Sequence, residues 1–95
     1  MAPIEQPLVF TVHGPIERDD LQGLCARVGK LLEGSGAGVA YCEVGTIAPD
    51  AVTVDALARL QLAAQRFGCR VHLSDASPEL QALVELMGLS DVLPE

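Results

Sequence analysis

Three short apolar runs of strand type alternate with three longer runs of helical periodicity, and this alternation constrains the fold more than any other feature of the chain. The strand-type runs are LVFTVH (8–13), GVAYCEV (38–44) and CRVHL (69–73), which are rich in β-branched, aliphatic and aromatic residues. Repeated strand–helix units favour an α/β domain whose helices pack on a sheet with parallel pairing. The sequence therefore predicts the order βαβαβα.

Each helical run starts at a capping residue, ends at a glycine and carries its apolar side chains on one side. The expected N-caps are Asp19, Asp50 and Ser77, and the expected helices span about 20–33, 51–66 and 78–87, before Gly34, Gly68 and Gly88. Helical spacing assigns these residues to the core: Leu21, Leu24, Cys25, Val28, Leu31 and Leu32, then Val54, Leu57, Leu60, Ala64 and Phe67, then Leu80, Leu83, Val84 and Met87. The C-terminal tail is expected to pack back on the body through Leu89, Val92 and Leu93.

The length and charge limit the class of protein. With 95 residues the chain suits one domain, residues 1–95 with a core of about 8–93. The net charge of −7 opposes contact with phosphate backbones and anionic membranes, so neither nucleic-acid binding nor membrane insertion is expected. The sequence shows no signal-peptide pattern and no apolar run of transmembrane length, which predicts a cytoplasmic protein.

Residue types that carry catalysis or bind metals are few and poorly spaced. Cys25, Cys42 and Cys69 form no CxxC pair and lie in apolar runs, where reduced core thiols are expected. The sequence has no Walker A lysine pattern, no GxGxxG and no GxSxG, and His13 and His72 occupy strand positions typical of structural histidines. We therefore predict a non-enzymatic protein without a metal or cofactor.

The segment TIAPDAVTVDAL (46–57) joins a predicted strand to a predicted helix. Asp50 and Asp55 lie five residues apart and point in different directions on a helix, so Asp50 is most simply an N-cap. The expected exposed positions of the helix mix charged and polar residues with alanines, and the larger ones are Asp55, Arg59, Leu62, Gln65 and Arg66. Such a face suits a protein contact, and it equally suits an ordinary solvated helix.

Three segments together match the pattern of a known family. VHGPIERDDL (12–21) is similar to a strand followed by G-x-L-D, with Gly14, Ile16 and Glu17 at the matching places. Residues 42–57 are similar to D-L-x-x-V-x-x-I-D-S-x-G-L-x-x-L, and GCRVHLSDASPELQALVELMGLSDVL (68–93) is similar to the family ending. The chain thereby resembles the STAS domain, the fold of bacterial anti-sigma factor antagonists, of small subunits of lipid-trafficking ABC transporters and of sulfate transporter tails.

The resemblance implies a single STAS-like domain, with a small mixed sheet and helices packed on it, that regulates a protein partner by direct binding. In the pattern of residues 42–57, Asp50 takes the place of the second Asp, Val54 that of the following Leu and Leu57 that of the final Leu. The implied partner is the ATPase domain of an anti-sigma factor kinase, and the implied role is transcription regulation in a bacterium. Ala51, however, occupies the place of the Ser or Thr that such a kinase phosphorylates.

Ala51 has no hydroxyl, so phosphoryl transfer at this position is chemically impossible. The pattern departs at two further places, because Cys42 replaces its first Asp and Thr53 replaces its glycine. Thr53 and Thr46 are the nearby hydroxyls that remain as displaced acceptors, although both are more simply helix-start and loop residues. We therefore expect an antagonist-like protein that binds its partner without the usual switch.

The predicted partner-binding surface surrounds Ala51. Its members are Thr46, Ile47, Pro49, Asp50, Ala51, Thr53, Val54, Asp55 and Arg59. Two alternatives remain open at this point. The first is an accessory subunit that binds the ATPase of an ABC-type lipid transporter, in which Ala51 needs no explanation. The second is a sensor of a small ligand or nucleotide that uses the loop before Asp50.

Overall fold

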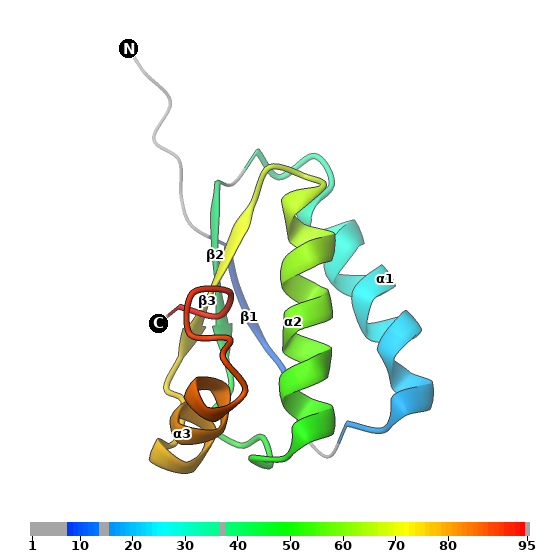
Figure 1. Cartoon of the computed structure of the whole chain (residues 1–95). Helices are drawn as coiled ribbons and strands as arrows, with labels where there is room; N and C mark the ends of the chain where they lie inside the picture. The colour runs from blue at the N-terminus through cyan, green and yellow to red at the C-terminus, as the bar shows by residue number, and fades with distance from the viewer. Residues whose placement is uncertain (1–7, 14–15, 37, 95) are drawn as a thin grey trace.

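The computed structural model describes residues 8–13, 16–36 and 38–94. Three strands alternate with three helices in the predicted βαβαβα order (Figure 1). The elements are β1 (Leu8–Thr11), α1 (Leu21–Leu32), β2 (Val39–Glu43), α2 (Ala51–Gln65), β3 (Arg70–Ser74) and α3 (Pro78–Leu86), with a 3₁₀ turn at Arg18–Asp20 before α1. Gly14, which the family resemblance uses, and the ends of the expected domain at 1–7 and 95 lie outside the described residues.

The sheet has the order β1-β2-β3, and both strand pairs are parallel. Phe10 aligns with Cys42 and Cys42 with Leu73, so one register continues across all three strands. Within the described residues no antiparallel strand joins the sheet, so the mixed sheet that was expected is there a parallel one. The βα connections explain this, because a strand–helix–strand unit returns the second strand in the same direction as the first.

One face of the sheet packs against the helices and the other faces solvent. Ala40 and Cys42 on β2 are fully buried, whereas Tyr41 between them is exposed. The helices α1 and α2 lie side by side over the buried face (Figure 1). The fully buried centre of the core comes from the sheet side, α2 and α3, and contains Val44, Val54, Leu57, Leu60, Val71 and Leu80.

Three predicted core residues are exposed instead, and all three lie at helix ends. Leu31 is 50% exposed in the last turn of α1, Phe67 is 45% exposed beyond the end of α2, and Met87 is 40% exposed at the C-cap of α3. Periodicity places each of them on the inner side of its helix, but each lies in the last turn of its helix or just beyond it. Four further predicted core residues are only half-buried: Leu21, Leu24, Cys25 and Leu83.

The caps of α2 and α3 follow the prediction. The Asp50 Oδ1 atom accepts a hydrogen bond from the Thr53 backbone N–H at 2.8 Å, and the Ser77 Oγ atom accepts one from Leu80 at 3.1 Å. The predicted Asp19 cap of α1 is wrong, because the N-cap is Asp20. The Asp20 carboxylate makes no capping bond and instead accepts from the Glu17 N–H at 3.3 Å, within the 3₁₀ turn that delays the start of the helix.

A buried glutamine holds the outer edge of β3. The Gln61 Nε2 atom donates to the carbonyl oxygens of Val71 at 2.8 Å and Val92 at 2.7 Å, and Oε1 accepts from the Val71 N–H at 2.8 Å. The Leu73 N–H donates to the carbonyl of Pro94 at 2.7 Å. The C-terminal tail therefore returns to the body as expected, although Val92 itself remains 36% exposed.

Candidate functional site

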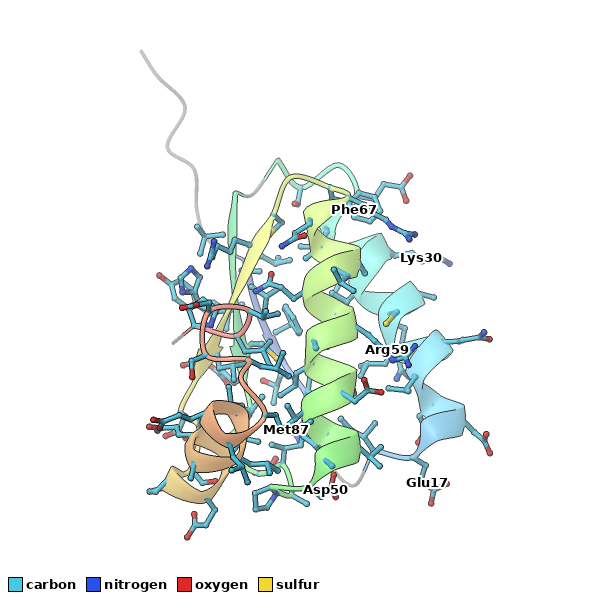
Figure 2. The ribbon with its side chains drawn as sticks, in the orientation of Figure 1. Glu17, Lys30, Asp50, Arg59, Phe67 and Met87 are labelled. Atoms are coloured by element: carbon cyan, nitrogen blue, oxygen red, sulfur yellow. The ribbon has the colours of Figure 1, made fainter. Side chains whose placement is uncertain are left out.

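The candidate site lies where β2 ends and α2 begins. The Val44 N–H donates to the carbonyl of Ser74 at the end of β3, and the Ile47 N–H donates back to the carbonyl of Val44 at 3.2 Å, so the loop turns tightly after the strand. A Cβ atom at Gly45 would lie 2.5 Å from the Asp75 Oδ2 atom, so any other residue here would require the Asp75 carboxylate to move. The loop thereby places Asp50 at the N-terminal end of α2, near the carboxyl ends of the strands (Figure 2).

Six of the nine residues predicted to bind a partner are exposed around the start of α2, and three are not. The exposed residues are Thr46, Pro49, Asp50, Ala51, Asp55 and Arg59. The side chains of Ile47, Thr53 and Val54 are buried, which corrects their assignment to an accessible surface. Thr53 and Val54 lie on the side of α2 that contains Leu57, and Ile47 anchors the loop in the core.

Ala51 is the first residue of α2 and is exposed, so its methyl group faces solvent at the helix N-terminus. Backbone N–H groups at such an end favour negative charge. The Asp50 carboxylate already supplies that charge, because it accepts the Thr53 N–H. This position therefore presents a small apolar group beside a carboxylate that is engaged in the helix cap.

The two nearby hydroxyls differ in accessibility. The Thr53 side chain is fully buried, and its Oγ1 atom has no hydrogen-bond partner within the described part of the chain. Thr46 is exposed in the loop, and its Oγ1 atom lies 3.4 Å from the His13 Nδ1 atom at the end of β1. Only Thr46 of these two can meet an enzyme without opening of the fold.

Asp55 and Arg59 form an ion pair on the exposed side of α2, with 3.0 Å between Asp55 Oδ2 and Arg59 Nε. The Arg59 side chain lies between α2 and α1 (Figure 2), where the pair borders a hollow of about 490 Å³. The other residues around this hollow are Asp19, Leu21 and Gln22. The sequence pattern did not include these three in the site, since it assigned Asp19 to a helix cap and Leu21 to the core. Their proximity to α2 results from helix packing, for which the sequence carries no local signal.

The three cysteines are poor nucleophiles in this fold. Burial raises the pKa of the Cys42 thiol to about 12, and the neighbouring Glu43 carboxylate acts in the same direction. Burial also raises the pKa values of Cys25 and Cys69, and the Arg59 charge only partly opposes this at Cys25. All three thiols are therefore protonated at neutral pH and lack thiolate character.

Two further features bear on the chemistry of the site. In residues 8–13, 16–36 and 38–94, no three His, Cys, Asp or Glu side chains are grouped so that they could hold a metal ion. Over the same residues, no helix combines the length and apolar character needed to cross a bilayer. The surface around Ala51 carries exposed small side chains, acidic side chains and an ion pair. Such groups suit recognition of a protein surface.

Comparison with known proteins identifies the fold. No protein-family model matches the sequence, and no curated protein matches it either. The structure is similar to that of the anti-sigma factor antagonist SpoIIAA in its unphosphorylated form, with a TM-score of 0.69 and 12% identity over 99% of this chain and 83% of that chain. It is also similar to a sulfate transporter family protein from Wolinella succinogenes, with a TM-score of 0.68 and 19% identity over 97% of this chain and 76% of that chain. The chain therefore has the STAS fold, which confirms the fold predicted from the resemblance.

Proposed function

We propose that this chain is a non-enzymatic regulatory domain that binds a protein partner through the exposed residues around Ala51, without a phosphoryl switch. We call these residues the docking face: Thr46, Pro49, Asp50, Ala51, Asp55 and Arg59. The domain spans residues 1–95 and acts in the bacterial cytoplasm. The partner is the ATPase domain of an anti-sigma factor kinase, and the ATPase of an ABC-type transporter is the second candidate.

The exposure of Ala51 at the first position of α2 is the observation that carries this proposal. The structure of the anti-sigma factor antagonist SpoIIAA, to which this chain is similar, shows that protein in its unphosphorylated form. A phosphoryl group adds about −1.5 to −2 charges where it is attached. A chain with a methyl group at this position keeps one charge state and presents one surface to its partner at all times.

The surroundings of Ala51 support a contact surface rather than a reaction centre. The Asp50 carboxylate is engaged in the cap, and the Arg59 guanidinium pairs with Asp55. Ala51 and Pro49 add small, rigid, exposed apolar groups through which a partner can approach closely. Contacts of this kind bind at a low cost in side-chain entropy.

Site-specific photo-crosslinking tests the docking face. The change Ala51→p-benzoylphenylalanine places a crosslinker at its centre, and Gln65→p-benzoylphenylalanine places one at an exposed position at the opposite end of the same helix. We expect the first variant to crosslink to the purified kinase-like ATPase or to the transporter ATPase, and the second to crosslink to neither. Equal crosslinking from both positions, or crosslinking from Gln65 alone, would reject the docking face.

A charge scan at position 51 tests the absence of a switch. Ala51→Glu introduces a negative charge at the docking face and should weaken partner binding, whereas Ala51→Ser should retain it and provide the missing hydroxyl. Incubation with the kinase and ATP, followed by intact mass measurement, should add a phosphate to the Ala51→Ser variant and none to the natural chain. A phosphate on Thr46 of the natural chain would refute the proposal that the switch is missing.

A further inference from the structure

A second hollow, similar in volume to the first, lies on the other side of α1, between this helix and strand β1. Its volume is about 500 Å³. The apolar part of its lining is Phe10, Val12, Ile16, Leu24, Val28 and Leu31. Pockets that bind small molecules have volumes of about 300–1,000 Å³ and mostly apolar walls, so this hollow has the size and character of a ligand site.

The apolar walls of this hollow are incompletely covered. Phe10 and Leu24 are only half-buried, and Leu31 is 50% exposed although it lies on the inner side of α1. Protein interiors are normally packed to the density of organic crystals, with few voids larger than a water molecule. A molecule with an apolar body would remove these walls from water and gain the free energy of that burial.

The positive charge of Arg27 at the rim of the hollow favours a molecule with a negatively charged head group. Arg27 borders the hollow and lies on the same side of α1 as Leu24, Val28 and Leu31. Among the described residues, Arg59 and Asp55 are the only side chains in an ion pair, so the Arg27 guanidinium has no carboxylate partner there. A guanidinium beside apolar walls is well suited to bind a carboxylate through two parallel hydrogen bonds.

The acidic residue of the lining lies at the other end of the hollow. Asp20 precedes Arg27 by seven residues, which corresponds to about 10 Å along the helix axis. Its carboxylate already accepts the Glu17 N–H in the 3₁₀ turn. The remaining polar residues of the lining are Thr11, the last residue of β1, and His13, two residues beyond it, and both are exposed. The cationic side of the hollow is therefore spatially separate from its acidic side.

We propose that the hollow between α1 and β1 is a binding site for an aliphatic carboxylate of medium chain length. The carboxylate pairs with Arg27, and the alkyl chain lies against Val12, Leu24, Val28 and Leu31. This site is separate from the docking face, and its existence does not depend on the proposed partner.

Isothermal titration calorimetry with the full chain tests the site. The probes are decanoate and, as a cation with the same alkyl chain, decyltrimethylammonium. We expect decanoate to bind with one site per chain and to bind more tightly than the cation. Arg27→Gln should weaken decanoate binding about tenfold, which corresponds to about 1.4 kcal/mol. Lys30→Gln is the matched control, since it removes a cation from the same helix outside the lining, and it should leave the affinity unchanged.

A filling variant and a map of the bound probe complete the test. Leu24→Trp places a larger side chain in the hollow and should abolish decanoate binding while the chain still unfolds cooperatively. In methyl NMR spectra, decanoate should shift the signals of Val12, Val28 and Leu31 and leave that of Leu86, on α3, in place.

Four outcomes would overturn the proposal. They are equal affinity for both probes, equal effects of Arg27→Gln and Lys30→Gln, methyl shifts confined to residues outside the lining, and an absence of decanoate binding. Absence of binding with a doubled molecular mass in solution would assign the hollow to a second copy of the chain. None of them bears on crosslinking from Ala51, so failure of this site and failure of the proposed function are distinguishable.

Discussion

The two sides of α2 use polar side chains in opposite ways. On the inner side, Gln61 is 1% exposed and makes three hydrogen bonds of 2.7–2.8 Å to backbone groups of β3 and the C-terminal tail. On the outer side, the Asp55–Arg59 pair has a similar separation of 3.0 Å, but both side chains are more than half exposed. The distances are alike, so burial and not geometry decides what each group contributes.

Water explains the difference. A buried N–H or carbonyl that loses its partner has no water to replace it and costs about 1–3 kcal/mol. An exposed ion pair competes with water and counterions and contributes about 0–1 kcal/mol. The polar groups on the inner side of α2 therefore stabilise the fold. Those on its outer side contribute little to stability and can bind a partner. The following predictions test this division, starting from the largest effect.

Gln61→Ala should be the most destabilising of the polar substitutions on α2 considered below. It leaves the Val71 N–H, the Val71 carbonyl and the Val92 carbonyl without their side-chain partner. We expect the free energy of unfolding to fall by about 3 kcal/mol in urea titrations, because several buried groups lose a bond at once. Gln65→Ala, the same change on the exposed side of the helix, should stay within about 0.5 kcal/mol of the natural chain. Similar losses in both variants would remove the distinction between the two sides.

The buried thiol of Cys42 should make stability depend on pH in the alkaline range. Burial raises its pKa from 9.0 to about 12, so the folded state holds the proton more tightly than the unfolded chain. This stabilisation is complete below pH 9 and is lost as the pH rises toward 12. From pH 9 to 10.5 the loss due to Cys42 should reach about 2 kcal/mol, at about 1.4 kcal/mol per pH unit.

The Cys42→Ala variant isolates this contribution. Its lost packing lowers stability by the same amount at every pH, so the slope of the free energy of unfolding against pH is the relevant measurement. We expect a flatter slope above pH 9 in the variant than in the natural chain. Equal slopes would mean that the thiol titrates normally and that the covered face of the sheet admits water.

Asp50 caps the start of α2. Its capping bond should contribute less to the free energy of unfolding than the bonds of Gln61 and more than the Asp55–Arg59 pair. Asp50→Ala removes the acceptor for the Thr53 N–H and should cost about 1 kcal/mol of stability, while Asp50→Asn keeps an oxygen acceptor and should cost only a few tenths. Ser77→Ala removes the corresponding bond at α3 and provides the control for a cap outside the docking face. Thermal unfolding of the three variants measures these costs. Partner binding should then weaken in Asp50→Ala and stay unchanged in Ser77→Ala.

Local features of the fold could be predicted from the sequence, and features made by distant segments could not. The caps at Asp50 and Ser77 and the positive φ angles of Gly34, Gly68 and Gly88 depend on neighbours within four residues, and the sequence contains those neighbours. Gln61 gave no signal, because its partners lie 10 and 31 residues away.

The same division applies to the candidate site. Its centre was predictable because Asp50 and Ala51 are adjacent in sequence to the loop that presents them. The sequence could not show which residues of the site are buried or which distant residues border it, because the burial of Ile47 and the approach of Asp19 to Arg59 depend on how the helices and the loop pack. Hydrophobic periodicity assigns a side to each helix residue but does not say whether a residue at the helix end is covered, and it therefore predicts Leu31 and Phe67 in the core although both are exposed.

The Asp55–Arg59 pair should show the smallest effect on stability and a clear effect on binding. A double-mutant cycle with Asp55→Ala and Arg59→Ala should give a coupling free energy of at most about 0.5 kcal/mol in urea titrations, as is typical of exposed pairs one helical turn apart. The same variants should bind the ATPase identified by crosslinking with lower affinity. A partner that covers the pair removes it from water and so strengthens the electrostatic interactions of its charges. A coupling energy above 1 kcal/mol in the free chain, with no change in binding, would make this pair a structural element like Gln61. The docking face would then have to be sought on another surface.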